Sequence, residues 1–359
     1  EYYEVKKVYQ NVGVKAVDIT KGQIEVFNKN YFEPMTDVEM VWSLWKDGKK
    51  IQESNAFKGP RNILGPREKG NYTIPFDYSA LDANSEYFVK VQFLLAKDMP
   101  WAKKGYVQME EQLPVKSAGQ FASIKESAKG DKPTLSQTKD KNLVKGNGFS
   151  VVFNNATGTI NSLQYGSKVI FADGNGPKLD AFRAMTDNDN WAYRQWFAKG
   201  LNNLQHKVLD SKVYTKEDGT VVLAYTVESQ APYGQNIRDL GISSGKYEIT
   251  KSKDFGPDDF KFTTNQIWTV YPDGSIELEA NINSSEPGLD LPRLGYVMKT
   301  PSDLKNYTYY GRGPQNNYND RMNGAFVQLY NSTVQDQFVH FPKPQSMGNR
   351  EDVRWCALT

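Results

Sequence analysis

The chain has 359 residues, and 44 Lys and Arg against 42 Asp and Glu leave a formal net charge of +2 with the two signs interspersed. This balance gives no cluster of basic residues that would bind nucleic acid or anionic lipid. No apolar run approaches the roughly 20 residues of a membrane span. The single cysteine, Cys356, excludes an intrachain disulfide and a metal site built on thiolates. Only two histidines occur, His206 and His340, which argues against zinc sites and Ser-His-Asp catalysis.

The composition and length predict a mostly β protein of two domains. Aromatic residues make up 13% of the chain, with 21 Tyr, 18 Phe and 7 Trp, and such residues favour strands. A chain of this length exceeds what one hydrophobic core usually organises. The chain begins with Glu1 rather than Met, from which we expect an excised preceding segment.

Residues 1–116 are predicted to form an immunoglobulin-like β-sandwich. Apolar residues alternate along short segments separated by turn residues, and Asp47-Gly48 is a tight hairpin signal. About seven strands over a hundred residues are typical of such sandwiches. The clearest expected strands are Gln23–Phe27, Asp37–Trp45, Lys50–Glu53, Tyr72–Phe76 and Glu86–Leu95.

Residues 117–141 are predicted to be a surface connector with one strand, Gly119–Ile124, and residues 142–359 a large antiparallel β-sandwich. Asp273-Gly274 indicates another hairpin, and Ala192–Leu204 is the best helix candidate. The expected strands are Gly148–Phe153, Thr159–Tyr165, Thr220–Glu228, Asp259–Tyr271, Ser275–Ile282 and Leu289–Lys299.

The strongest polar concentration is a loop that contains Arg183, Asp187, Asn188 and Asp189. Its carboxylates and amides could ligate Ca²⁺ or Mg²⁺, or could cap a turn through side-chain bonds to backbone amides. We favour the structural turn and assign no metal. Arg183 is expected to pair with Asp187 or Asp189 and hold the loop shut.

A second group of polar residues follows the expected strand Tyr307–Tyr310. Arg and Gln offer donors for sugar hydroxyls, Asp an acceptor and Tyr a stacking face, so these residues are candidates to face a carbohydrate. The alternative is a network of Asp320 with Arg321 or Arg312 that braces the sheet edge, and a lone His is usually structural. The candidates are Arg312, Gln315, Tyr318, Asp320, Arg321, His340, Asn349 and Arg350.

Several strings occur in an order that resembles the C-terminal third of glycoside hydrolase family 2 enzymes of the large bacterial β-galactosidase type. The resemblance extends over nearly the whole chain, from about Glu4 to Trp355. The strings are Glu4–Gln10, Trp101–Gly105, Phe182–Asp189, Tyr310–Gln315, Asn317–Arg321 and Gly348–Trp355.

The resemblance implies that the chain follows a catalytic barrel. In this family a TIM barrel carries the two catalytic glutamates and is followed by an immunoglobulin-like domain and a sandwich of the galactose mutarotase type. Glu4–Gln10 would be the tail leaving the barrel, and the last sandwich would be incomplete at Thr359, before a loop whose tryptophan reaches the sugar. We therefore expect a C-terminal fragment that supports the barrel and its sugar pocket and is inactive alone. Its expected partners are the N-terminal catalytic portion and a galactoside or related glycan.

Retaining hydrolysis needs two carboxyls about 5 to 5.5 Å apart. Glu110-Glu111 is a poor candidate because neighbouring strand residues face opposite ways, so no catalytic residue is assigned. Asn316 stands where the family usually has a glutamate, which leaves a different β-glycoside open as substrate. A stand-alone carbohydrate-binding module is the main alternative function, and mutarotase activity is a weaker one because it usually needs a His and Glu pair.

The sequence assigns no cofactor and leaves open a divalent or monovalent cation in the parent enzyme, as well as a homo-oligomer. A periplasmic or secreted bacterial location is favoured over a cytoplasmic one.

Overall fold

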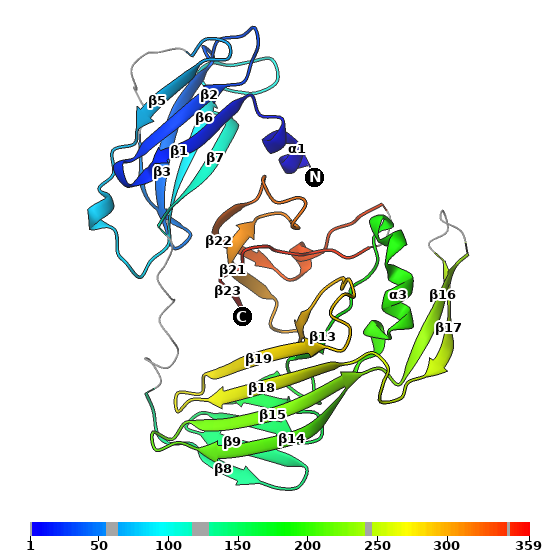
Figure 1. Cartoon of the computed structure of the whole chain (residues 1–359). Coiled ribbons are helices and arrows are strands. Elements are labelled where there is room, and N and C mark those ends of the chain that lie inside the picture. The colour runs from blue at the N-terminus through cyan, green and yellow to red at the C-terminus, as the bar shows by residue number, and fades with distance from the viewer. Residues whose placement is uncertain (1, 55–63, 117–128, 241–245, 343–344) are drawn as a thin grey trace. The chain divides into compact units, whose positions relative to one another are not determined.

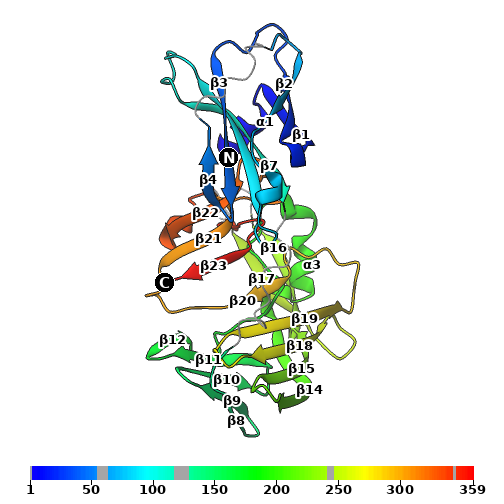
Figure 2. The same cartoon turned by 90° about the vertical axis from the view of Figure 1, so that its left-hand side faces the viewer.

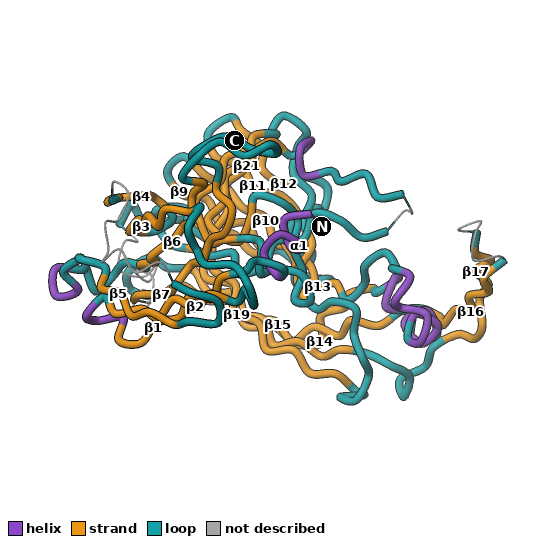
Figure 3. Tube along the Cα trace, turned by 90° about the horizontal axis from the view of Figure 1, so that it is seen from above, coloured by secondary structure: helices purple, strands orange, loops and turns teal. Residues whose placement is uncertain are grey.

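The computed structural model describes residues 2–54, 64–116, 129–240, 246–342 and 345–359. Strands dominate these residues (Figure 3). The α-helices among the described residues are short and are α1 (Tyr2–Val8) and α3 (Tyr193–Ala198). The predicted all-β fold with β-sandwiches is confirmed. Within the described part of the chain, no helix has the length and apolar character needed to cross a membrane.

Contacts divide the chain into two units. Unit 1 comprises Glu1–Ala122, Lys305–Val339 and Met347–Thr359, and unit 2 comprises Ser123–Leu304 and His340–Ser346. The last three strands thus cluster with the N-terminal part of the chain. The domain boundaries proposed from sequence, after residues 116 and 141, stay a prediction, and the expected strand Gly119–Ile124 lies outside the described residues.

Unit 1 contains a sandwich of two antiparallel sheets in the order β1-β2-β5 and β4-β3-β6-β7 (Figure 1). Alternation places one face of each sheet inward, as in β6, where Val89, Val91 and Phe93 are buried against Trp42 and Ile24. Seven strands divided in this way suit an immunoglobulin-like core. The strands are β1 (Val12–Asp18), β2 (Gln23–Asn28), β3 (Val38–Lys46), β4 (Lys49–Glu53), β5 (Lys69–Thr73), β6 (Tyr87–Leu95) and β7 (Val107–Lys116).

A third sheet of unit 1, in the order β22-β21-β23, packs on this sandwich. It is formed by β21 (Asn306–Gly313), β22 (Phe326–Thr333) and β23 (Trp355–Leu358). Tyr310 and Val327 are buried together with Phe88.

The turn between β3 and β4 meets this sheet. Asp47 and Gly48 both have positive φ, 47° and 79°, which fits the predicted two-residue hairpin. A Cβ on Gly48 would lie 2.5 Å from the amide nitrogen of Leu329. The carbonyl of Gly48 accepts a hydrogen bond from that same amide at 3.1 Å. Glycine therefore serves both the turn and the close approach of β22.

Unit 2 is built on two antiparallel sheets, a five-stranded meander in the order β12-β11-β10-β9-β8 and a four-stranded sheet in the order β14-β15-β18-β19 (Figure 2). Their facing side chains, such as Phe153 and Trp268, form one core in which these two rings meet edge to face at 5.6 Å. The strands are β8 (Thr134–Gln137), β9 (Lys141–Gly146), β10 (Phe149–Asn154), β11 (Thr159–Tyr165), β12 (Lys168–Phe171), β14 (Gln205–Thr215), β15 (Val221–Gln230), β18 (Phe262–Val270) and β19 (Ile276–Ser284).

A second core of unit 2 surrounds α3, whose Tyr193, Trp196 and Phe197 are buried. Two short pairs complete the unit, β13 (Lys178–Asp180) with β20 (Gly295–Val297) and the hairpin β16 (Tyr233–Asp239) with β17 (Tyr247–Asp254). The 3-10 helices of the chain are η1 (Ile19–Lys21), η2 (Tyr78–Ala80), η3 (Asp187–Trp191), η4 (Leu201–Asn203) and η5 (Gln335–Gln337).

Candidate functional site

Asn317 joins the two segments that carry most of the predicted carbohydrate-facing residues. Its side chain is buried, donates to the carbonyls of Arg312 and Gln315 at 3.1 and 3.0 Å, and accepts from the amide of Glu351 at 2.8 Å. Asn349 donates to the Asn317 carbonyl at 2.8 Å and accepts from its backbone amide at 2.9 Å. We call residues 311–324 and 348–352 the polar frame.

The arginines of the polar frame are engaged by the protein itself. Arg312 donates to Asp352 at 2.6 Å and to the carbonyl of Ala325 at 2.9 Å. Arg350 donates to the Tyr309 hydroxyl at 3.1 Å and to Gln337 at 2.5 Å. The structure thus contains a bracing network. In it Arg312 forms its ion pair with Asp352, whereas the alternative interpretation of the sequence considered Asp320 as a partner of Arg321 or Arg312.

The remaining candidates differ in their surroundings. Gln315 donates to the Gly324 carbonyl at 2.9 Å. Tyr318 and Arg321 form a short β-bridge, with the guanidinium 5.1 Å from the centre of the ring, and Asp320 is exposed in the same turn. His340 is exposed and is grouped with unit 2, whereas the other seven candidates lie in unit 1.

The loop around Asp189 forms a capped turn in unit 2. Asp189 accepts two hydrogen bonds from Arg183 at 2.7 and 3.0 Å and one from the Thr186 amide at 2.6 Å, which completes a capping box at η3. Burial opposes ionisation of Asp189, but the bonds from Arg183 and Thr186 outweigh it and lower the pKa of the carboxyl. Asp187 starts η3 and Asn188 follows it. Among the described residues, no three His, Cys, Asp or Glu side chains are placed to hold a metal ion.

Glu110 and Glu111 do not act as a carboxyl pair. Both lie on β7, where Glu110 pairs with Lys90 at 2.9 Å and Glu111 with Lys7 at 2.8 Å. Each carboxylate is therefore neutralised by its own lysine.

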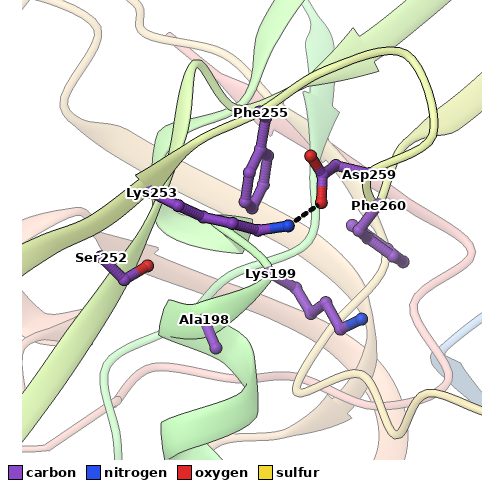
Figure 4. Close-up of a pocket in the computed structure, with 7 residues that line it drawn as sticks. All are labelled: Ala198, Lys199, Ser252, Lys253, Phe255, Asp259 and Phe260. Atoms are coloured by element: carbon purple, nitrogen blue, oxygen red, sulfur yellow. Dashed lines mark hydrogen bonds and ion pairs between the residues drawn. The ribbon is translucent and has the colours of Figure 1, made fainter.

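A hollow of about 440 Å³ in unit 2 was not predicted from sequence (Figure 4). Lys253 and Asp259 pair across it at 2.5 Å, and the Lys253 ammonium lies 5.7 Å from the centre of the Phe255 ring. Such a mixture of charged groups and an aromatic ring is compatible with a polar organic ligand. Three separate segments supply the lining, so no single motif could have indicated it; the lining residues are Ala198, Lys199, Ser252, Lys253, Phe255, Asp259 and Phe260.

Comparison with known proteins decides the family. The model described as β-galactosidase small chain matches residues 145–359, and the model for β-galactosidase domain 4 matches residues 24–116. The chain belongs to the β-galactosidase small-chain family. The resemblance drawn from the ordered strings is thereby confirmed.

Bacterial β-galactosidases are similar to this small-chain family member over almost its whole length. The enzyme of Priestia megaterium (strain DSM 319 / IMG 1521) is 27% identical and that of Lactobacillus delbrueckii subsp. bulgaricus 28% identical, each over 99% of this chain and 31% of the relative. A β-galactosidase of Psychromonas ingrahamii (strain DSM 17664 / CCUG 51855 / 37) is 25% identical over 98% of this chain and 32% of its own length. The chain therefore spans about a third of the length of these curated relatives.

The family assignment gives the polar frame a context. It lies within the small-chain match, but its sheet packs on strands that the domain 4 model matches, since Tyr310 of β21 contacts Phe88 of β6. The side chain that organises the frame, Asn317, is part of a string quoted for the resemblance. It was not singled out from sequence because its partners at positions 349 and 351 are remote along the chain.

Proposed function

We propose that this chain is the C-terminal portion of a β-galactosidase of glycoside hydrolase family 2, which supports the catalytic barrel and its sugar pocket and has no activity alone. The observation that carries the proposal is the match to β-galactosidases over 99% of this chain but only 31% of their length. The antiparallel sheets described here differ from the parallel barrel on which the family resemblance places the catalytic glutamates.

In the whole enzyme the polar frame would form part of a rigid wall beside the sugar. Support comes from its internal bonding, because a donor set fixed by Asn317 and Asp352 is pre-organised rather than flexible. Tyr318, Asp320 and Arg321, in one turn of the frame, are the residues proposed to face a galactoside or related β-glycoside. In the whole enzyme, substitution of Asp320 by Asn should then raise KM for nitrophenyl β-galactoside. The substitution should leave the stability of the chain unchanged.

The decisive test is hydrolysis of nitrophenyl β-galactoside by the purified chain, alone and mixed with the portion of the parent protein that contains the barrel. We expect activity only in the mixture. A second mixture, in which a catalytic glutamate of the barrel is changed to glutamine, controls for contaminating hydrolase. Turnover by the chain alone, or a well-folded mixture without turnover, would contradict the proposal.

A second candidate function is independent carbohydrate binding, and the hollow beside Phe255 is the observation that favours it. The polar frame gives this candidate less support, because Arg312 and Arg350 already donate to protein groups. Calorimetric titration of the chain with galactosides distinguishes the two functions. A heat of binding that is abolished by Asp259→Asn would support independent carbohydrate binding. The absence of any heat of binding at millimolar sugar would oppose it.

A further inference from the structure

The hollow of unit 2 is shaped by a glycine at which three segments converge. A Cβ on Gly234 of β16 would lie 2.5 Å from the carbonyl oxygen of Ala198, at the end of α3. It would also lie 2.9 Å from the Phe255 ring and 2.9 Å from the hydroxyl oxygen of Ser252. Any side chain at this position would therefore push apart the segments that line the hollow, and only glycine allows them to meet.

Phe255 gives the hollow an apolar surface. Its backbone amide donates to the carbonyl of Pro232 at 3.0 Å, which holds the residue at the end of the β16–β17 hairpin. Its side chain is half-buried, whereas Phe260 beside it is buried. In Figure 4 the Lys253 side chain passes the Phe255 ring on its way to Asp259. An aromatic ring in a small-molecule site typically packs against an apolar part of the ligand, such as the C–H face of a sugar ring.

Hydrogen-bond donors dominate the polar part of the lining. Lys199 and Lys253 each carry three N–H donors, and each has one printed ion-pair partner, Glu286 for the first and Asp259 for the second. The side chains of the two lysines extend in the same direction in Figure 4. Ser252 adds a hydroxyl group to the same lining. Most of the donors of the two ammonium groups therefore remain available to a ligand.

Discussion

Glu86 connects the immunoglobulin-like sandwich to the last sheet of unit 1, and its replacement by Gln should destabilise that unit strongly. The carboxylate accepts from Arg354 at 2.9 and 2.6 Å and from the Tyr310 hydroxyl at 2.5 Å. The side chains of Glu86 and Arg354 are only 12% and 18% exposed. Burial and the bond to Glu86 also raise the pKa of Tyr310.

The magnitude follows from what the substitution leaves behind. Breaking a buried ion pair costs about 3–5 kcal/mol because one charge stays buried without a partner, and the residual exposure here reduces the expected loss to about 2–4 kcal/mol. The matched control is Asp37→Asn, which removes the exposed pair of Asp37 with Lys97 and should cost at most about 1 kcal/mol.

The assay must report on unit 1, because a chain of two units need not unfold in one step. Native-state hydrogen exchange of the β21 and β6 amides gives the opening free energy of this unit directly. A cycle with Glu86→Leu and Arg354→Met should show a coupling of about 2 kcal/mol. Equal losses for Glu86→Gln and Asp37→Asn, or a coupling near zero, would refute the role assigned to this contact.

Three further predictions concern single contacts. Burial lowers the pKa of His206 from 6.5 to about 4, so the unfolded chain binds its proton first and stability should fall from about pH 6.5 down to pH 4; His206→Asn should flatten that part of the stability curve, by up to about 3 kcal/mol, and an unchanged slope would contradict this. Asp189→Asn should cost unit 2 about 2–3 kcal/mol in denaturant unfolding, because Arg183 loses a partly buried partner, and a loss below that of an exposed pair would contradict the capped loop. Gln112→Ala removes two hydrogen bonds of 2.9 Å to the backbone of Val327 and should speed exchange of the β22 amides selectively, so uniform exchange would count against it.

Strands with one buried face could be predicted well from the sequence. The expected strand Glu86–Leu95 corresponds to β6 (Tyr87–Leu95), whose side chains alternate between buried and half-buried. The expected strand Tyr72–Phe76 instead corresponds to β5 (Lys69–Thr73), because Pro75 cannot donate a ladder hydrogen bond. Leu289–Lys299 shortens to β20 (Gly295–Val297) after Pro292 for the same reason.

Other elements lack a signal that periodicity can detect. Every residue of β17 is exposed, so its hairpin with β16 shows no clear alternation of apolar and polar residues. The helix expected over Ala192–Leu204 is divided, because Gly200 adopts a positive φ of 66° between α3 and η4.

Contacts between remote residues could not be predicted from a single sequence. Glu86 and Arg354 are 268 residues apart in the chain. Neither residue belongs to a motif that names the other, and a lone Glu or Arg usually lies in water. The candidate list was therefore drawn from local strings, and it contained Arg312 and Arg350 but not Asn317, which connects their two segments.

The packing of unit 1 shows that the two regions matched by β-galactosidase family models depend on each other physically. Val327 and Tyr310 lie in the small-chain match, yet they are buried with Phe88 of the domain 4 match. Gln112 bonds both backbone groups of Val327, and Glu86 binds Arg354, so apolar and polar contacts cross the same boundary. If the small-chain region were cut away from domain 4, its last sheet would expose apolar side chains and leave a half-buried guanidinium unpaired. The smallest stable piece of this enzyme should therefore include both matched regions, and the folding of the last sheet should require the sandwich that precedes it by about two hundred residues in the chain.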